Sequence, residues 1–257
     1  METDIKSIHD FDVNLICEYF SNLQRQGPGS DFETLRALSF IDKLESSSLV
    51  ADIGCGTGTP TLVLARHTNA QIVGIDLYPK FIDRLNADAR RLNLQGRVVG
   101  KLGDMANLPF CENSLDLIWS EGAVYNIGFG RAMAEWHALL KRGGAVAVSE
   151  STWLTDSRPA EIQRFWDDAC PQMDTLSNNI RKMTRQGYRP IATFVLPEIC
   201  WTENFYLPQA KIQERFLQQH RGSLFVKDFV ANQRHEFEMY KKYHQYYGYV
   251  FYIGRKM

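Results

Sequence analysis

The alternation of short apolar runs with amphipathic stretches between Leu49 and Glu150 is the feature that most limits how this chain can fold. Each run has the length of a strand, and each stretch has helical spacing. Strands that alternate with helices in this way build βαβ units around a parallel sheet, and near-continuous apolar runs are typical of strands covered on both faces. The predicted strands are LVADIG, QIVGIDL, RVVGKLGD, LDLIWSEG and GAVAVSE, and the predicted helices are TPTLVLARH, FIDRLNADARRLNL and GRAMAEWHALLKRGG.

Both flanks of this region carry further predicted elements. Residues 1–45 are expected to form an N-terminal helical segment that serves as a lid, interrupted by the glycine–proline break QGPGS. RPIATFVLP and YGYVFYIGRK are predicted late strands without a short crossover, which suggests an antiparallel pair at one sheet edge. Within a domain of residues 46–257, helical insertions at about 152–187 and 202–245 are expected to cap the carboxyl ends of the strands.

Composition and charge argue against several classes of function. The 257 residues include 29 basic and 30 acidic side chains, so no overall field attracts nucleic acid or anionic lipid. No apolar run approaches the roughly 20 residues of a membrane span, and the N-terminus lacks the pattern of a signal peptide. Five scattered cysteines without a CxxC pair predict a reduced, cytoplasmic protein with no metal site. The expected assembly is a monomer or a homodimer.

The turn after the first predicted strand and two later aspartates predict a ligand site. Ligands of doubly wound sheets bind beyond the carboxyl ends of the strands. Gly54, Gly56 and Gly58 fall there, where a backbone without Cβ atoms allows close approach and a helix N-terminus follows. Asp76 ends the second predicted strand, placed to accept hydrogen bonds from ribose hydroxyls. Asp104 ends the third, where its carboxylate can accept from an exocyclic amine.

The ordered motifs VADIGCGTG, IVGIDL, GDMANLPF, LDLIWSEGA and LKRGGAVAVSE resemble the core of the class I S-adenosylmethionine-dependent methyltransferases, over about residues 49–150. The resemblance implies an α/β fold with a doubly wound, mostly parallel, seven-stranded Rossmann-like sheet whose last strand is reversed. It implies S-adenosyl-L-methionine as cofactor and methyl transfer to a small-molecule acceptor. The cofactor-binding residues that it implies are Asp52, Gly54, Cys55, Gly56, Gly58, Asp76, Leu77, Asp104, Met105, Glu121, Gly122 and Ala123.

The resemblance also implies which part of the cofactor each of these residues contacts. Asp52 would pair with the α-amino group, directly or through water, and Asp76 would hold the ribose. Asp104 and the Met105 backbone would bind the adenine, with Leu77 as an apolar neighbour of the ring. The glycine turn would contact the methionine portion.

Candidate catalytic residues follow the fourth and fifth predicted strands. In-line methyl transfer from a sulfonium depends mainly on proximity and alignment, so a general base is optional. If the acceptor is a protonated amine or a hydroxyl, Glu121 or Glu150 are candidate bases, and Tyr125 is a candidate acceptor-binding residue. The atom that accepts the methyl group is left open.

Two other functions remain open. An NAD-dependent Rossmann oxidoreductase would also use Asp76, but its fingerprint is GxGxxG, whereas this turn is GxGxG. A non-catalytic S-adenosylmethionine-binding protein would keep the pocket, although we would then expect degenerate glycines or a missing acidic partner. The near-neutral charge and the predicted cap favour a small-molecule acceptor over nucleic acid or a membrane.

The QGPGS break is a candidate mobile loop. It directly precedes a predicted helix whose N-terminus carries the capping pair Ser30 and Glu33. Because the link from that helix to the first strand is short, the loop is expected near the carboxyl edge of the sheet. Our hypothesis is that it closes over bound cofactor and excludes water.

Overall fold

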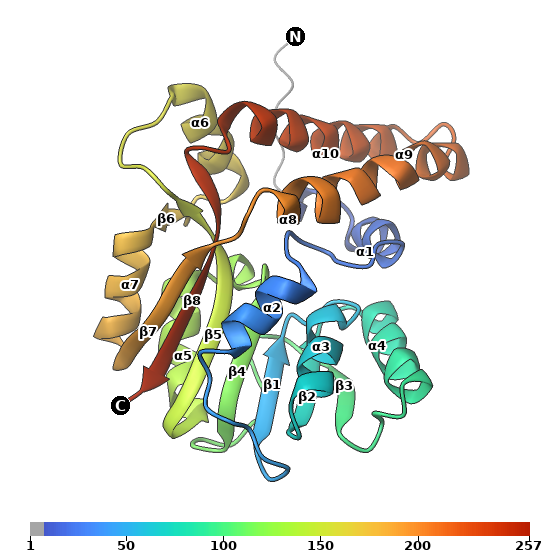
Figure 1. Ribbon diagram of the computed structural model, residues 1–257. Helices are drawn as coiled ribbons and strands as arrows, with labels where there is room; N and C mark the ends of the chain where they lie inside the picture. Colours follow the sequence, from blue (N-terminus) through green and yellow to red (C-terminus); the bar gives the residue numbers. More distant parts are fainter. Residues whose placement is uncertain (1–7) are drawn as a thin grey trace.

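One twisted sheet with helices on both faces forms the body of the protein (Figure 1). The computed structural model describes residues 8–257, so the first seven residues of the predicted N-terminal segment lie outside the described part of the chain. Seven strands follow the order β3-β2-β1-β4-β5-β8-β7, and the short β6 pairs with the end of β5. The strands are β1 (Leu49–Ile53), β2 (Gln71–Asp76), β3 (Val98–Leu102), β4 (Leu115–Glu121), β5 (Leu140–Trp153), β6 (Asp174–Thr175), β7 (Tyr188–Val195) and β8 (Tyr247–Lys256).

The strand directions confirm the predicted doubly wound, mostly parallel sheet. β1 to β5 pair in parallel, whereas β8 runs antiparallel to both β5 and β7, so the last strand is reversed as expected. Successive residues of one strand, such as Leu117 and Ile118 of β4, belong to separate apolar clusters on opposite faces of the sheet. Burial on both faces is the reason that the strand sequences are almost continuously apolar.

Helices cover the two faces of the sheet and the edge where the parallel strands end. In Figure 1, α1 (Val13–Ser21) and the group from α8 (Ile199–Trp201) to α10 (Leu224–Tyr243) lie beyond the carboxyl ends of the parallel strands. The helical elements are η1 (Ile8–Asp10), α1 (Val13–Ser21), α2 (Asp31–Leu38), α3 (Thr59–His67), α4 (Pro79–Arg91), η2 (Val124–Asn126), α5 (Phe129–Leu139), α6 (Ala160–Ala169), α7 (Leu176–Arg185), α8 (Ile199–Trp201), the π-helical turn η3 (Thr202–Tyr206), α9 (Leu207–Gln219) and α10 (Leu224–Tyr243). No helix within residues 8–257 combines the length and apolarity that crossing a membrane requires.

One predicted helix is shorter in the structure than the sequence pattern suggests. The stretch GRAMAEWHALLKRGG is helical only to Leu139, and β5 begins at Leu140. Leu140 is paired with Leu115 of β4, so sheet pairing ends the helix before the Gly143–Gly144 stop signal is reached. Tertiary pairing overrides local helix propensity here.

Candidate active site

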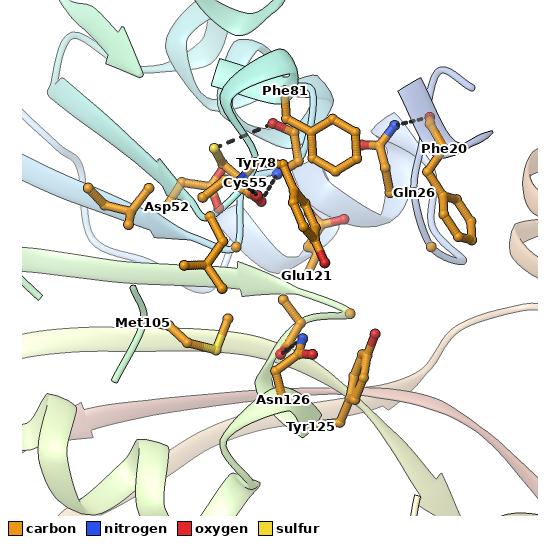
Figure 2. A pocket seen from close by; sticks show the side chains of 18 of the residues that line it. Phe20, Gln26, Asp52, Cys55, Tyr78, Phe81, Met105, Glu121, Tyr125 and Asn126 are labelled. Atoms are coloured by element: carbon orange, nitrogen blue, oxygen red, sulfur yellow. Dashed lines mark hydrogen bonds between the residues drawn. The ribbon is translucent and has the colours of Figure 1, made fainter. Parts of the chain in front are cut away.

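A cavity of about 330 Å³ lies at the carboxyl ends of β1, β2 and β4, and we call it the first cavity. Figure 2 shows side chains from the glycine turn, from the N-terminal loop (residues 22–30, between α1 and α2) and from the loop after β3 gathered around it. The sequence-predicted residues that line it are Asp52, Gly54, Cys55, Gly56, Asp76, Leu77, Asp104, Met105, Glu121, Gly122, Ala123 and Tyr125. Gly58 and Glu150, which were also predicted, are not among its described lining residues.

The glycine turn holds a left-handed backbone in close contact with its neighbours. Gly54 has φ +70°, and a Cβ there would lie 2.4 Å from the Ala123 Cβ. Gly56 has φ +56°, and a Cβ there would lie 2.4 Å from the Gln26 Oε1. Both positions therefore need glycine, for conformation and for space. Gly58 serves a different contact, since its Cβ would meet the Leu85 side chain.

Asp52 is a buried carboxyl group at the wall of the first cavity. Its Oδ2 accepts a hydrogen bond of 2.5 Å from the Thr61 hydroxyl, and it forms no ion pair with any residue of the range 8–257. Desolvation raises the pKa of Asp52 to about 7, against the opposing effect of the Thr61 hydrogen bond. A cationic ligand group beside Asp52 would compensate its buried charge.

Asp76 and Asp104 lie at neighbouring strand ends, as the parallel topology predicts. The Asp76 Oδ2 accepts from the Gly56 N–H at 2.9 Å, and its Oδ1 accepts from the Tyr78 N–H at 3.0 Å. Asp76 thereby ties β2 to the glycine turn, and each oxygen keeps a second lone pair for a ligand hydroxyl. The Asp104 Oδ1 accepts from the Ala106 N–H at 2.8 Å, which orients its carboxylate at the cavity wall.

Glu121 is held by three donors, which favours an anchoring role over proton abstraction. Its Oε1 accepts from the Thr34 hydroxyl at 2.7 Å and from the Trp119 indole N–H at 3.0 Å. Its Oε2 pairs with the Arg25 guanidinium at 3.1 Å, and the Arg25 and Glu121 side chains are only 8% and 7% exposed. The Oε1 atom already accepts two hydrogen bonds, and a proton taken up on Oε2 would remove the charge that pairs with Arg25.

Glu150 is buried in β5, beneath the cavities rather than on their surface. Its Oε1 accepts from the Ser151 N–H at 2.8 Å and from the Ser151 hydroxyl at 2.9 Å, and Oε2 makes no hydrogen bond within the described chain. Desolvation raises the pKa of Glu150 to about 7, opposed by the Ser151 hydrogen bonds. Tyr125, by contrast, reaches cavity surface, and burial raises the pKa of its phenol, so the hydroxyl stays protonated at neutral pH.

The raised pKa of Glu150 predicts that this side chain makes stability depend on pH. The folded state binds the proton more tightly than the unfolded chain, so the contribution of Glu150 is full below pH 4.5 and is lost as pH rises through about 7. We therefore compare the free energy of unfolding of Glu150→Gln with that of the parent at each pH. The variant's value relative to the parent should be about 3 kcal/mol more favourable at pH 8 than at pH 4. Urea unfolding at the two pH values measures this difference.

A matched control shows whether the effect of Glu150→Gln depends on the burial of this carboxyl group. Glu135→Gln alters a carboxylate that is 43% exposed on α5, where it pairs with Arg131 at the surface, and it should cost less than about 1 kcal/mol of stability. A Glu150→Gln difference that is equal at pH 4 and pH 8 would contradict the assignment of a raised pKa to Glu150.

A smaller cavity of about 110 Å³ adjoins the first, and we call it the second cavity. Phe20, Gln26, Pro28, Gly122 and Tyr125 are among the residues that line both cavities, so the two meet at the N-terminal loop and the end of β4. The remaining wall of the second cavity comes mainly from α6, the α8–η3 turn, α10 and β8.

The N-terminal loop lies across the glycine turn, where the sequence predicts it. The Gln26 Oε1 accepts from the Thr57 N–H at 3.0 Å, and the Gln24 carbonyl accepts from the Thr59 hydroxyl at 2.6 Å. The Asn204 side chain of η3 donates to the Gly29 carbonyl at 2.9 Å. The sequence predicts a loop at the QGPGS break, but it does not indicate that Gln26 within this break contacts the glycine turn.

Residues 50–144 match the family model described as "Methyltransferase domain". A curated relative, 27-O-demethylrifamycin SV methyltransferase of Amycolatopsis mediterranei (strain S699), is 26% identical over 126 residues, which cover 47% of this chain and 44% of that protein. The chain spans half or less of the length of the curated relatives it matches.

Solved structures share the fold over nearly the whole chain. The [4+2]-cyclase SpnF superposes with a TM-score of 0.75 at 21% identity, covering 95% of this chain and 93% of that one. Geranyl diphosphate C-methyltransferase from Streptomyces coelicolor A3(2), solved with Mg²⁺, geranyl diphosphate and S-adenosyl-L-homocysteine, superposes with a TM-score of 0.64 at 17% identity, covering 88% of this chain and 79% of that one.

Three findings agree on the family. The domain match covers the predicted motifs from VADIGCGTG to the start of LKRGGAVAVSE, and the mostly parallel sheet has the predicted reversed last strand. The glycine turn, Asp76 and Asp104 lie at one cavity. The family uses S-adenosyl-L-methionine as methyl donor. Together they identify residues 50–144 as a methyltransferase domain, with the fold and the glycine-turn cavity expected of the class I S-adenosylmethionine-dependent methyltransferases.

Proposed function

We propose that this protein transfers a methyl group from S-adenosyl-L-methionine to a small-molecule acceptor, with the cofactor in the first cavity. The observation that carries the proposal is the convergence of Asp52, the glycine turn, Asp76 and Asp104 on this cavity. When bound, S-adenosyl-L-methionine supplies a methyl group on a positively charged sulfur. Asp52 is suited to the cofactor ammonium because it is a buried carboxyl without an ion-pair partner in the described chain.

The remaining cofactor-binding residues follow from their positions around the first cavity. Asp76 is placed to accept from the ribose hydroxyls, and Asp104 to accept from the adenine amine. Leu77 and Met105 offer apolar surface to the adenine ring, while Cys55 packs beside the turn. Gly54 and Gly56 keep the turn open to the methionine portion, and Gly58 supports the turn from behind through its contact with Leu85.

The acceptor side begins where the two cavities meet, and Gly122 and Tyr125 lie there, next to Ala123 of the first cavity. A second cavity of only about 110 Å³ and a net charge of −1 support a small acceptor rather than nucleic acid. Proximity and alignment are the main requirements of the reaction, so Tyr125 is proposed to orient the acceptor. Glu121 is proposed to hold the N-terminal loop over the site, and Glu150 to support the floor beneath Ser151.

Direct transfer is the test, because a fold shared with a [4+2]-cyclase does not define the reaction. The protein is incubated with methyl-labelled S-adenosyl-L-methionine and a metabolite extract, and we expect labelled product together with an equal amount of S-adenosyl-L-homocysteine. Calorimetry with S-adenosyl-L-methionine and with NADH should show binding of the first alone. Cofactor binding without transfer would contradict the proposal in favour of a non-catalytic binding protein.

We also propose that the N-terminal loop closes over bound cofactor as a lid. Gln26 and Pro28 line both cavities, and Gln26 contacts the turn through Thr57. Hydrogen exchange with and without S-adenosyl-L-homocysteine should therefore show added protection at residues 20–31 as well as at the turn. Protection that is confined to residues 54–58 would mean that the loop is an ordinary connection.

A further inference from the structure

The second cavity has a wall of aromatic rings that are fixed by other rings behind them. Trp201 stacks on Tyr240 with ring centroids 4.7 Å apart, and Trp166 meets the Tyr247 ring edge-on at 5.1 Å. The π-helical turn η3 interrupts the helix between α8 and α9, and turns of this kind often mark functional sites. The aromatic residues of the wall are Phe20, Tyr125, Phe165, Trp166, Trp201, Phe205 and Tyr249.

Glu236 of α10 is the one carboxylate among the described residues of this wall. Its Oε1 accepts from the Tyr206 hydroxyl at 2.9 Å, and it has no ion pair with any residue of the range 8–257. Lysine, arginine and histidine are all missing from the described wall. The protein packed around Glu236 desolvates it and raises its pKa to about 7, while the surface that it keeps faces the cavity.

An aromatic wall around a single carboxylate is a chemical environment that favours cations. The faces of tryptophan, tyrosine and phenylalanine attract ammonium groups electrostatically, and more strongly when water is excluded. A cation beside Glu236 would also offset the cost of its buried charge. An anion would meet a carboxylate with no basic side chain of the described wall to oppose it, so phosphate and carboxylate groups are disfavoured here.

We propose that the second cavity binds the methyl acceptor through a cationic amine that pairs with Glu236, on an apolar body that packs against the aromatic wall. This inference rests on the proposed methyltransferase function. Glu236 lines the second cavity but not the first, whereas Gly122 and Tyr125 line both cavities. The amine is thus the anchor of the acceptor, and the atom that receives the methyl group lies toward Gly122 and Tyr125.

The proposed transfer balances without a further reactant. A lone pair of the acceptor forms the new bond to the methyl carbon as the sulfur–carbon bond breaks. The sulfonium becomes a neutral thioether, and the acceptor atom gains the positive charge. Where that atom carries a proton, the proton leaves to solvent.

Binding of matched probes tests the site without requiring turnover. The protein is saturated with S-adenosyl-L-homocysteine and titrated in a calorimeter with tryptamine, tryptophol and indole-3-propionate, and with phenylethylamine, 2-phenylethanol and 3-phenylpropionate. In at least one series we expect the amine to bind about tenfold tighter or more than its alcohol and its acid. No amine binding in either series, or equal binding of an alcohol or an acid, would overturn the proposal.

Variants on one helix show whether Glu236 is responsible. Glu236→Gln should weaken amine binding about tenfold or more, while the variant stays folded and its affinity for S-adenosyl-L-homocysteine stays close to the parent value. Glu238→Gln is the matched control, because Glu238 lies on the same helix but is 65% exposed and paired with Lys241. Unchanged amine affinity in Glu236→Gln would remove Glu236 from the site.

A transfer assay separates this inference from the proposed function. A metabolite extract is divided by ion exchange into cationic, neutral and anionic fractions, and each is incubated with methyl-labelled S-adenosyl-L-methionine. Label in the cationic fraction that is lost in Glu236→Gln supports both proposals. Label in the neutral or anionic fraction alone overturns the amine assignment but leaves methyl transfer intact, whereas no label in any fraction counts against the proposed function itself.

Discussion

Replacing Arg25 with alanine should destabilise the protein by about 3–5 kcal/mol, the cost of leaving one partner of a buried ion pair uncompensated. Glu121 would keep its hydrogen bonds from Thr34 and Trp119, which places the effect toward the lower end of that range. The loop that follows Arg25 would also lose its tie to the end of β4. Urea unfolding measures the stability, and hydrogen exchange at residues 22–31 reports on the loop.

Two further variants show whether the buried pair is the cause. Arg131→Ala breaks a pair with Glu135 whose side chains are 52% and 43% exposed, and it should cost less than about 1 kcal/mol. Adding Glu121→Gln to Arg25→Ala should recover part of the lost stability, because the uncompensated charge is removed. A cost for Arg25→Ala no larger than that for Arg131→Ala would show that the pair does not anchor the loop.

Replacing Asp76 with alanine should weaken S-adenosyl-L-methionine binding by about 2–4 kcal/mol, the order expected for losing hydrogen bonds to a charged group. Two effects contribute to the loss. The ribose hydroxyls would lose their acceptor, and the Gly56 N–H would lose the carboxylate that holds the turn against β2. Calorimetric titration of the folded variant gives the dissociation constant.

Asp83→Ala is a suitable control for the Asp76 experiment, because Asp83 is exposed on the adjoining helix α4 and does not line the first cavity. Asp76→Asn should bind more tightly than Asp76→Ala, since the amide oxygen can still accept one hydrogen bond. An Asp76→Ala variant that is folded and binds S-adenosyl-L-methionine as well as the parent would exclude Asp76 from the cofactor site.

The convergence of the acidic residues on the first cavity is a part of the site that the sequence predicts well. Asp76 ends β2 and Asp104 follows β3 by two residues, and the short runs before them become neighbouring parallel strands. Parallel strands end at the same edge of a sheet, so residues at their carboxyl ends must lie close together. Strand periodicity and connection rules are local signals, and they are sufficient for this inference.

The contacts of the two candidate bases, Glu121 and Glu150, cannot be predicted from such local signals. Arg25 and Glu121 are 96 residues apart in the chain, and no pattern around either one marks the other. Glu150 follows a predicted strand as a catalytic residue would, yet β5 continues to Trp153 because it pairs with β8 as far as Tyr247. That longer pairing places the Glu150 carboxylate inside the protein instead of at a strand end.

The sequence by itself determined the sheet, its reversed last strand and the edge at which the glycine turn and two aspartates meet, because burial on both faces and the handedness of βαβ units leave few alternatives. Only the tertiary structure decided that Arg25 neutralises Glu121, and that Glu236 faces a ring of aromatic side chains. These contacts join segments that are distant in the chain. Helical periodicity specifies which face of a helix is buried, but not which distant side chains meet it there.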